Sequence, residues 1–176
     1  MQQLRNQPGI GAAALEFAIL TAARSGEVRG ASWPEINFPE RLWLIPADRM
    51  KAGREHRIPL SDTAIAILER MKEHHVSEFV FPGTKQDKPL SDMSLTAVLK
   101  RMERGDLTAH GFRSTFRDWA SETTAYPQEV CEMALAHTIA NKVEAAYRRG
   151  DLFEKRIKLM TDWASYCNGM AATIQS

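Results

Sequence analysis

A pair of strand-like runs close together in sequence interrupts a chain in which most other segments have the residue spacing of helices. Residues 41–46 (Arg-Leu-Trp-Leu-Ile-Pro) and residues 56–60 (His-Arg-Ile-Pro-Leu) are short and rich in branched and aromatic side chains, a composition that favours strands. The loop between them contains Gly53 and places Lys51 near its tip. The sequence therefore predicts an α+β domain that is mainly helical and carries one small antiparallel sheet.

The helical segments are recognised by the recurrence of apolar residues every three or four positions. In the segment that begins at Ser61 or Asp62, for example, Ile65, Leu68 and Met71 form such a stripe behind a capping residue. The predicted helices are residues 11–24, 25–30, 61–73, 91–103, 110–123, 127–136, 141–147 and 151–167. In the last helix, the residues expected to face inward are Leu152, Ile157, Met160, Trp163 and Ala164. Residues 79–81 are expected to form a brief strand. We expect Pro34 to end any helix before it.

Length and charge set limits on what the chain can be. At 176 residues it fits one domain with a full core, residues 1–176. A net charge of +1 argues mildly against a nucleic-acid-binding protein, although the distribution of charge matters more than its sum. Residues 49–57 and 100–104 are two basic stretches; such runs can bind phosphates or can simply be a solvated face.

The sequence points to a cytoplasmic protein without metal or cofactor. Cys131 and Cys167 are far apart and lack the spacing of a zinc site, so we expect reduced thiols. No apolar run approaches the roughly 20 residues of a membrane span, and the opening residues do not contain a signal-peptide core. Because the first helical pattern starts almost at once, we expect either an excised domain with an added Met1 or a naturally truncated gene.

Several polar residues stand inside distinctive local sequences. Arg24 lies in Thr-Ala-Ala-Arg-Ser-Gly-Glu-Val, and Lys51 lies in Met-Lys-Ala-Gly-Arg-Glu-His-Arg-Ile-Pro-Leu-Ser. His110 and Arg113 share Thr-Ala-His-Gly-Phe-Arg-Ser-Thr-Phe-Arg, while His137 ends Leu-Ala-His and is followed by Ala-Ala-Tyr-Arg-Arg, which contains Tyr147. Together these motifs resemble the catalytic domain of the tyrosine recombinase (phage integrase) family, and most closely the integrases of satellite phages and genomic islands.

The resemblance extends from about residue 15 to about residue 166 and implies a DNA strand transferase. In that reading Tyr147 attacks a phosphodiester and forms a 3′-phosphotyrosine bond, and a 5′ hydroxyl later attacks that bond to join the exchanged strands. Integration or excision of a mobile element would follow. The family carries DNA-binding domains ahead of the catalytic one, and we expect residues 1–176 to contain the catalytic domain alone.

The chemistry of phosphodiester cleavage explains why these residue types belong together. Extra negative charge develops on the non-bridging oxygens, and the two arginines, Arg24 and Arg113, are suited to hold it because each is planar, bidentate and always charged. His110 and Arg113 are three residues apart and share a helix face. His110 either takes the tyrosine proton or holds the phosphate, and His137 is expected to donate to a non-bridging oxygen. Glu27 is expected to orient a neighbour.

Tyr147 and Lys51 complete the expected site. A phenol has a pKa near ~10 and needs a base or a cationic pocket to attack at neutral pH. Lys51, on a flexible hairpin, can reach the leaving 5′ oxygen and protonate it. His137 and Tyr147 are ten residues apart and would not share a face of one straight helix, so a break near residues 140–141 is required.

The expected partner is double-stranded DNA carrying attachment sites, bound by a homo-tetramer, with a monomer or weak oligomer in its absence. Arg54, His56, Arg57 and Arg148 are further candidates for DNA contacts, although His56 could equally face solvent. Residues 151–176 are expected to form a C-terminal helix and tail that could dock on a neighbouring protomer. Tyr126 and Tyr166 are expected to be structural.

Three other functions fit parts of the pattern. A tyrosine-type topoisomerase would share the chemistry but would relax DNA without pairing two sites. A metal-dependent nuclease would need carboxylates clustered near the basic residues, and none stand out in the sequence. A non-catalytic DNA-binding remnant would form no covalent adduct.

Overall fold

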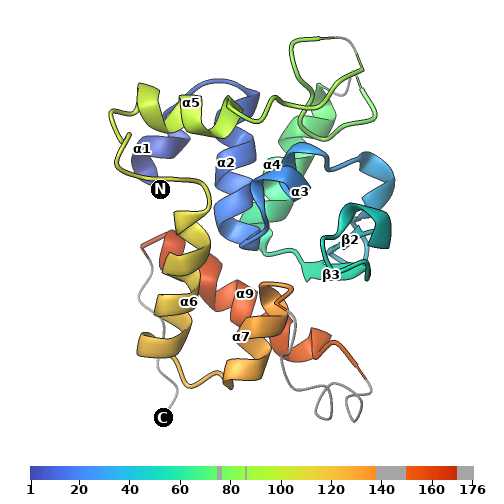
Figure 1. Ribbon diagram of the computed structural model, residues 1–176, viewed down its shortest axis with the longest axis vertical. Helices are drawn as coiled ribbons and strands as arrows, with labels where there is room; N and C mark the ends of the chain where they lie inside the picture. The colour runs from blue at the N-terminus through green and yellow to red at the C-terminus, as the bar shows by residue number, and fades with distance from the viewer. Residues whose placement is uncertain (75–76, 86, 138–149, 170–176) are drawn as a thin grey trace.

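The computed structural model describes residues 1–74, 77–85, 87–137 and 150–169 (Figure 1). The helices are α1 (Gln2–Arg5), α2 (Ile10–Thr21), α3 (Ser25–Arg29), α4 (Asp62–Glu73), α5 (Ser94–Arg101), α6 (Gly111–Thr123), α7 (Gln128–Ala134) and α9 (Phe153–Cys167). The 3₁₀ turns are η1 (Trp33–Glu35) and η2 (Ala47–Arg49), and the strands are β1 (Ile36–Asn37), β2 (Leu42–Ile45) and β3 (His56–Pro59). The expected architecture, mainly helical with a small antiparallel sheet, is therefore confirmed.

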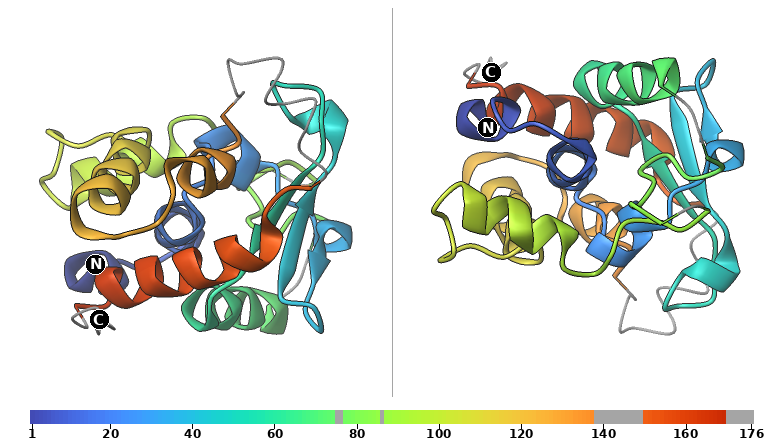
Figure 2. Two further views of the ribbon diagram at one scale, coloured as in Figure 1. Left: turned by 90° about the horizontal axis from the view of Figure 1, so that it is seen from below. Right: turned by 90° about the horizontal axis from the view of Figure 1, so that it is seen from above.

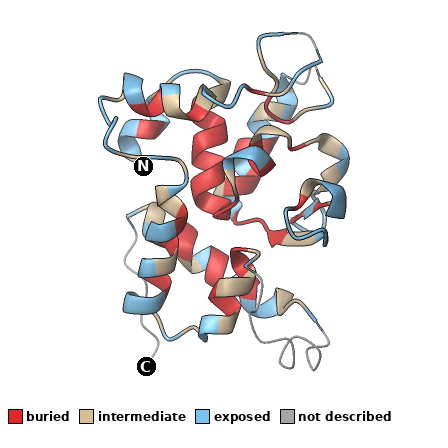
Figure 3. Cartoon of the chain, in the orientation of Figure 1, coloured by how far each residue is buried: buried red, intermediate tan, exposed pale blue. Residues whose placement is uncertain are grey.

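Helix α2 forms the centre of the molecule. Every residue from Ala12 to Thr21 is buried, including Glu16, whose Oε1 lies 2.6 Å from Nε of Arg5. A helix that is apolar on all sides must be covered on all sides. Helices α1, α4, α5 and α9 pack against it, and Figure 2 shows α2 end-on with the other helices around it. The buried residues accordingly concentrate on α2 and on the helix faces turned toward it (Figure 3).

The predicted hairpin is present and gains a third strand. The strand order is β1-β2-β3, all antiparallel, with Trp43 opposite Ile58 and Ile45 opposite His56. The Trp43 ring lies 5.3 Å from that of Phe17 and so joins the sheet to α2. Strand β1 has only two residues, too short for the sequence pattern to reveal. Residues 79–81 were expected to form a strand, but there the structure has only an isolated bridge between Ser32 and Phe79.

The end of one helix near the site differs from the sequence prediction. Helix α2 was expected to run to Arg24 but ends at Thr21, because Ala22 adopts the left-handed conformation with φ of 50°. Arg24 is instead the N-cap residue of α3. Helix α3 ends at Arg29, before Pro34 as expected, and Pro34 itself lies within the 3₁₀ turn η1.

Helices α6, α7 and α9 form the second part of the core. The rings of Phe116 and Trp119 on α6 lie 5.3 and 5.1 Å from that of Trp163 on α9, and Trp163 Nε1 donates to the Ile19 carbonyl at 2.7 Å. Contrary to the expected inward stripe, Ile157 is exposed, whereas Arg156 is buried. Leu152 is only partly buried, and Met160, Trp163 and Ala164 are buried as expected.

The predicted helix at residues 141–147 lies outside the described residues, as do Tyr147 and Arg148. Within the described part of the chain, no helix has the length and apolar character needed to cross a bilayer.

Candidate active site

A cleft of about 630 Å³ lies where α3, the β2–β3 loop and the end of α7 meet. The residues that line it are Arg24, Lys51, Ala52, Arg54, Glu132, Ala136 and His137. These residues come from three distant stretches of sequence. The cleft therefore brings together three of the predicted catalytic residues, Arg24, Lys51 and His137, and one predicted DNA contact, Arg54.

Arg24 is held at the start of α3 by Glu27. The Arg24 main-chain N–H donates to Glu27 Oε2 at 2.8 Å, and its Nη1 donates to Glu27 Oε1 at 2.7 Å. The Glu27 side chain is buried, whereas that of Arg24 is 30% exposed. Because a guanidinium has five N–H donors, contact through Nη1 leaves other donors for a ligand in the cleft. Glu27 thus orients its neighbour, as expected.

A chain of polar contacts behind Glu27 fixes α3 to the sheet. Arg49 Nη2 donates to the Glu27 carbonyl at 2.6 Å, and Arg49 also forms an ion pair with Glu35. Glu35 in turn accepts from Trp43 Nε1 at 2.9 Å. Arg49 belongs to the basic stretch 49–57, which was considered for DNA contact, but its guanidinium is used inside the protein.

Arg113 lies behind the cleft rather than on its surface. It is 5% exposed; Nη1 donates to the Ala22 carbonyl, and Nη2 donates to the Leu135 carbonyl at 2.7 Å. Burial, and then the nearby charge of Arg24, lower the pKa of Arg113 from 12.5 to about 10. The group therefore remains charged at neutral pH. Its Nη2 lies 3.5 Å from Nε2 of His137.

His137 is presented by the C-terminal end of α7. Ala136 adopts the left-handed conformation with φ of 49°, and the main-chain N–H of His137 bonds back to the Glu132 carbonyl at 3.0 Å. These are features of a Schellman helix ending. The ring's Nδ1 lies 2.6 Å from Glu132 Oε2, and the side chain is 42% exposed. The end of α7 therefore turns the Nε2 edge of the ring toward Arg113.

The side chains of Lys51 and His110 are more exposed to solvent than those of Arg24 and Arg113. Lys51 follows the buried Met50 and is exposed on the hairpin loop, as is Arg54. His110 is the N-cap residue of α6, one turn before Arg113. It is exposed and is not among the residues that line the cleft. His110 therefore lies close to Arg113 in sequence and at the start of its helix, but it is not one of the residues that the cleft brings together.

His56 and Arg57, two candidates for DNA contact, make contacts within the protein. His56 shares the covered face of the sheet with Trp43 and Ile58, so it is partly buried rather than facing solvent. Burial, followed by the charge of Arg156, lowers the pKa of His56 to about 4, and the ring is neutral at pH 7. Arg57 lies with its guanidinium carbon 4.0 Å from the centre of the Phe153 ring and pairs with Asp151 at 3.5 Å.

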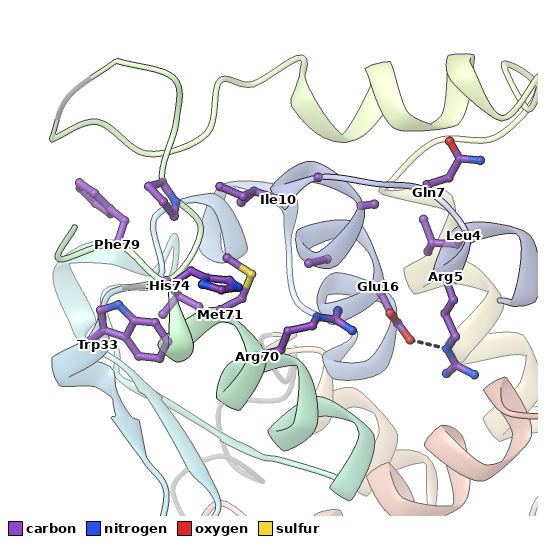
Figure 4. A pocket seen from close by; sticks show the side chains of 15 residues that line it. Leu4, Arg5, Gln7, Ile10, Glu16, Trp33, Arg70, Met71, His74 and Phe79 are labelled. Atoms are coloured by element: carbon purple, nitrogen blue, oxygen red, sulfur yellow. Dashed lines mark hydrogen bonds and ion pairs between the residues drawn. The ribbon is translucent and has the colours of Figure 1, made fainter. Parts of the chain in front are cut away.

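A second cavity of about 490 Å³ lies between α1, α2 and α4 (Figure 4). It contains the Arg5–Glu16 pair, and none of the predicted site residues line it. Among the described residues, no group of three or more His, Cys, Asp or Glu side chains could hold a metal ion.

Glu132 is the site residue that the sequence analysis missed. Glu132 lines the cleft and contacts His137. It precedes the Leu-Ala-His motif in the sequence, so the motif did not single it out. A carboxylate five residues before a histidine is a weak signal by itself. It acquires meaning only from the left-handed turn at Ala136, which brings the two side chains together.

Comparisons with known proteins identify the family of the chain. The sequence profile of the Phage integrase family matches residues 1–152. "Prophage integrase IntA" of Escherichia coli (strain K12) is 43% identical over 151 residues, which are 84% of this chain and 36% of the relative. The chain thus spans little more than a third of that curated relative's length.

Two solved structures share the fold. The lambda integrase catalytic core gives a TM-score of 0.57 at 20% identity, over 80% of this chain and 87% of that one. A lambda integrase tetramer bound to a Holliday junction gives a TM-score of 0.59 at 19% identity, over 85% of this chain and 45% of that one. With its sequence match, its motifs and its fold in agreement, the chain belongs to the phage integrase family, the tyrosine recombinases that its motifs resemble.

Proposed function

We propose that this chain is the catalytic part of a site-specific DNA recombinase that cleaves and rejoins strands through a phosphotyrosine bond. The observation that carries the proposal is the gathering of Arg24, Arg113 and His137 from three separate segments around one cleft, with Lys51 on its rim. Three side chains that can donate hydrogen bonds suit a phosphate that gains charge in the transition state.

The described residues divide the work as follows. Arg24, held by Glu27, offers its guanidinium to a non-bridging oxygen. Arg113 supplies charge from behind the cleft and contacts His137. Lys51 reaches the leaving 5′ oxygen from the hairpin loop and gives it a proton. His110, at the N-terminal end of α6, serves the tyrosine hydroxyl or the phosphate.

The role of Tyr147 rests on its sequence motif and on family membership, since it lies outside the described residues. Its hydroxyl oxygen attacks phosphorus, the bond to the 5′ oxygen breaks, and that oxygen takes a proton. Attack of a second 5′ hydroxyl then restores the phosphodiester and frees the tyrosine. The phosphotyrosine retains the energy of the broken bond, so strand exchange needs no ATP.

The partners follow from this chemistry. The substrate is duplex DNA, and the reaction takes place in the cytoplasm. By analogy with the tetramer reported for lambda integrase, we propose that copies of this protein assemble on paired sites. Their joint action integrates or excises a mobile element. Arg54 on the cleft rim, and Arg148, are the residues that we propose contact DNA in addition. The apolar face of α9 packs within its own chain, so docking on a neighbour would use its exposed side, which includes Tyr166.

Trapping the covalent adduct tests the proposal. The purified chain is incubated at low salt with a nicked duplex that carries the element's attachment site, and the product is resolved under denaturing conditions. We expect an adduct with the wild type and none with Tyr147→Phe, because the phenyl ring lacks the attacking oxygen. Tyr126→Phe and Tyr166→Phe are the matched controls and should retain it. An adduct that persists in Tyr147→Phe would reject the assignment of the nucleophile.

A further inference from the structure

The carboxylate of Glu132, one of the residues that line the cleft, lies between two basic side chains. Its Oε2 is 2.6 Å from Nδ1 of His137, and its Oε1 is 2.7 Å from Nε of Arg117. Arg117 lies four residues after Arg113 on α6, so both arginines are on the same side of that helix. Glu132 thus connects the histidine of one segment to the helix that carries the buried arginine.

The contact determines which ring nitrogen carries hydrogen. A carboxylate oxygen only accepts hydrogen bonds, so Nδ1 of His137 must be the donor. The opposite nitrogen, Nε2, faces Arg113 Nη2 at 3.5 Å. A neutral ring with its hydrogen on Nδ1 offers a lone pair there; a ring with hydrogen on both nitrogens can donate from Nε2 to a phosphate oxygen.

The Glu132 carboxylate is itself held in place. Arg117 pairs with Oε1, the oxygen that does not contact His137, at 2.7 Å. Glu132 and His137 are also joined through the main chain, at 3.0 Å. The ring therefore has little freedom to turn away from Arg113.

We propose that Glu132 is a positioning residue that keeps hydrogen on Nδ1 of His137 and directs Nε2 at the scissile phosphate. The inference deepens the proposed function and rests on it for its catalytic consequence. Arg117, in turn, holds the Glu132 carboxylate by pairing with its other oxygen.

The imidazole nitrogens can be observed directly. In the full chain labelled with ¹⁵N-histidine, long-range ¹H–¹⁵N spectra report which nitrogen is protonated, and a His137→Asn sample assigns the signals. We expect hydrogen on Nδ1 in the wild type. Glu132→Ala should shift it toward Nε2, which a free imidazole prefers, and Glu132→Gln should preserve the wild-type state because its amide oxygen still accepts. If Glu132→Ala leaves the hydrogen on Nδ1, the proposal is wrong.

The catalytic consequence is measured separately as the single-turnover rate of adduct formation. Carboxylates behind metal-bound histidines contribute about 10–100-fold, and we expect a loss of that size in Glu132→Ala with unchanged DNA affinity. Glu122→Ala, exposed near the end of α6, is the control and should react like the wild type. A wild type that forms no adduct would refute the proposed function, while the spectra would still decide whether Glu132 sets the state of His137.

Discussion

Arg113 on α6 donates a hydrogen bond to the main-chain oxygen of Ala22, which ends α2 in a left-handed conformation. Its second bond reaches the carbonyl of Leu135. Ala22 lies two residues before Arg24, and Leu135 lies two residues before His137. One buried guanidinium therefore fixes the main chain just ahead of two other site residues. The same Arg113 side chain that we propose stabilises charge on the phosphate therefore also holds the main chain that positions Arg24 and His137.

Arg113→Lys should reduce the free energy of unfolding even without DNA. An ammonium group cannot reach both carbonyls in the planar geometry of a guanidinium, and a buried carbonyl left without a partner costs about 1–3 kcal/mol. Urea denaturation measures the change. Arg117→Lys is the control, because its pair with Glu132 is partly exposed and should be worth about 1 kcal/mol or less. Equal stability of the two variants would contradict the structural role of Arg113.

Ala136→Gly should stabilise the protein. A residue with a Cβ in the left-handed conformation costs roughly 1–2 kcal/mol relative to glycine, partly offset by the larger entropy that glycine loses on folding. We expect a net gain of about 0.5–1 kcal/mol in urea denaturation. Ala134→Gly, two residues earlier within α7, should instead destabilise by about 1 kcal/mol or more. A destabilised Ala136→Gly variant would argue against the left-handed ending of α7.

His56 should make the protein less stable as the pH falls from about 6.5 toward 4. Burial lowers its pKa from 6.5 to about 4, so above pH 6.5 the ring is neutral in both the folded and the unfolded chain. At lower pH the unfolded chain binds a proton that the folded chain does not, and the free energy of unfolding decreases. The largest loss in the free energy of unfolding is about 1.4 kcal/mol for each unit of difference between the pKa values of the unfolded and folded chains.

The check is the stability difference between pH 7 and pH 5, measured for the wild type and for His56→Gln. The variant should lose less stability than the wild type over that interval, because it lacks the titrating ring. His74→Gln, exposed at the end of α4, should lose as much as the wild type. Identical losses in wild type and His56→Gln would show that His56 does not titrate in this way.

The features predicted well from sequence have local causes. Ser61 caps α4 by accepting from the Ala64 N–H at 3.3 Å, and this helix has the predicted end at Glu73. The hairpin carrying Lys51 follows from its branched residues and its glycine. The end of α2 was misplaced because alanines at 22 and 23 favour continuing a helix, whereas the helix ends where Arg113, far along the chain, bonds to Ala22.

The same distinction explains the basic stretch. Nothing in the sequence around Arg49 or Arg57 shows that Glu35 and Asp151 will pair with them. The pairing of Arg49 and Arg57 could therefore not be predicted, whereas Lys51 and Arg54 of the same stretch are exposed, as are Lys100, Arg101 and Arg104 of the second stretch. Motif residues fared better: the cleft gathers Arg24, Lys51 and His137, and Arg113 contacts His137. Their roles in catalysis stay predictions.

Lys51 provides the most direct test of leaving-group chemistry. If its ammonium protonates the departing 5′ oxygen, Lys51→Ala should slow adduct formation on ordinary DNA by about 10²–10⁴-fold, the usual contribution of a general acid. On a substrate whose bridging 5′ oxygen is replaced by sulfur, the variant should approach the wild-type rate, because a thiolate leaves without a proton. Arg54→Ala, from the same loop and cleft, is the comparison. Any loss there should be equal on both substrates, since it would reflect binding rather than proton transfer. If Lys51→Ala is impaired equally on both substrates, Lys51 is not the general acid.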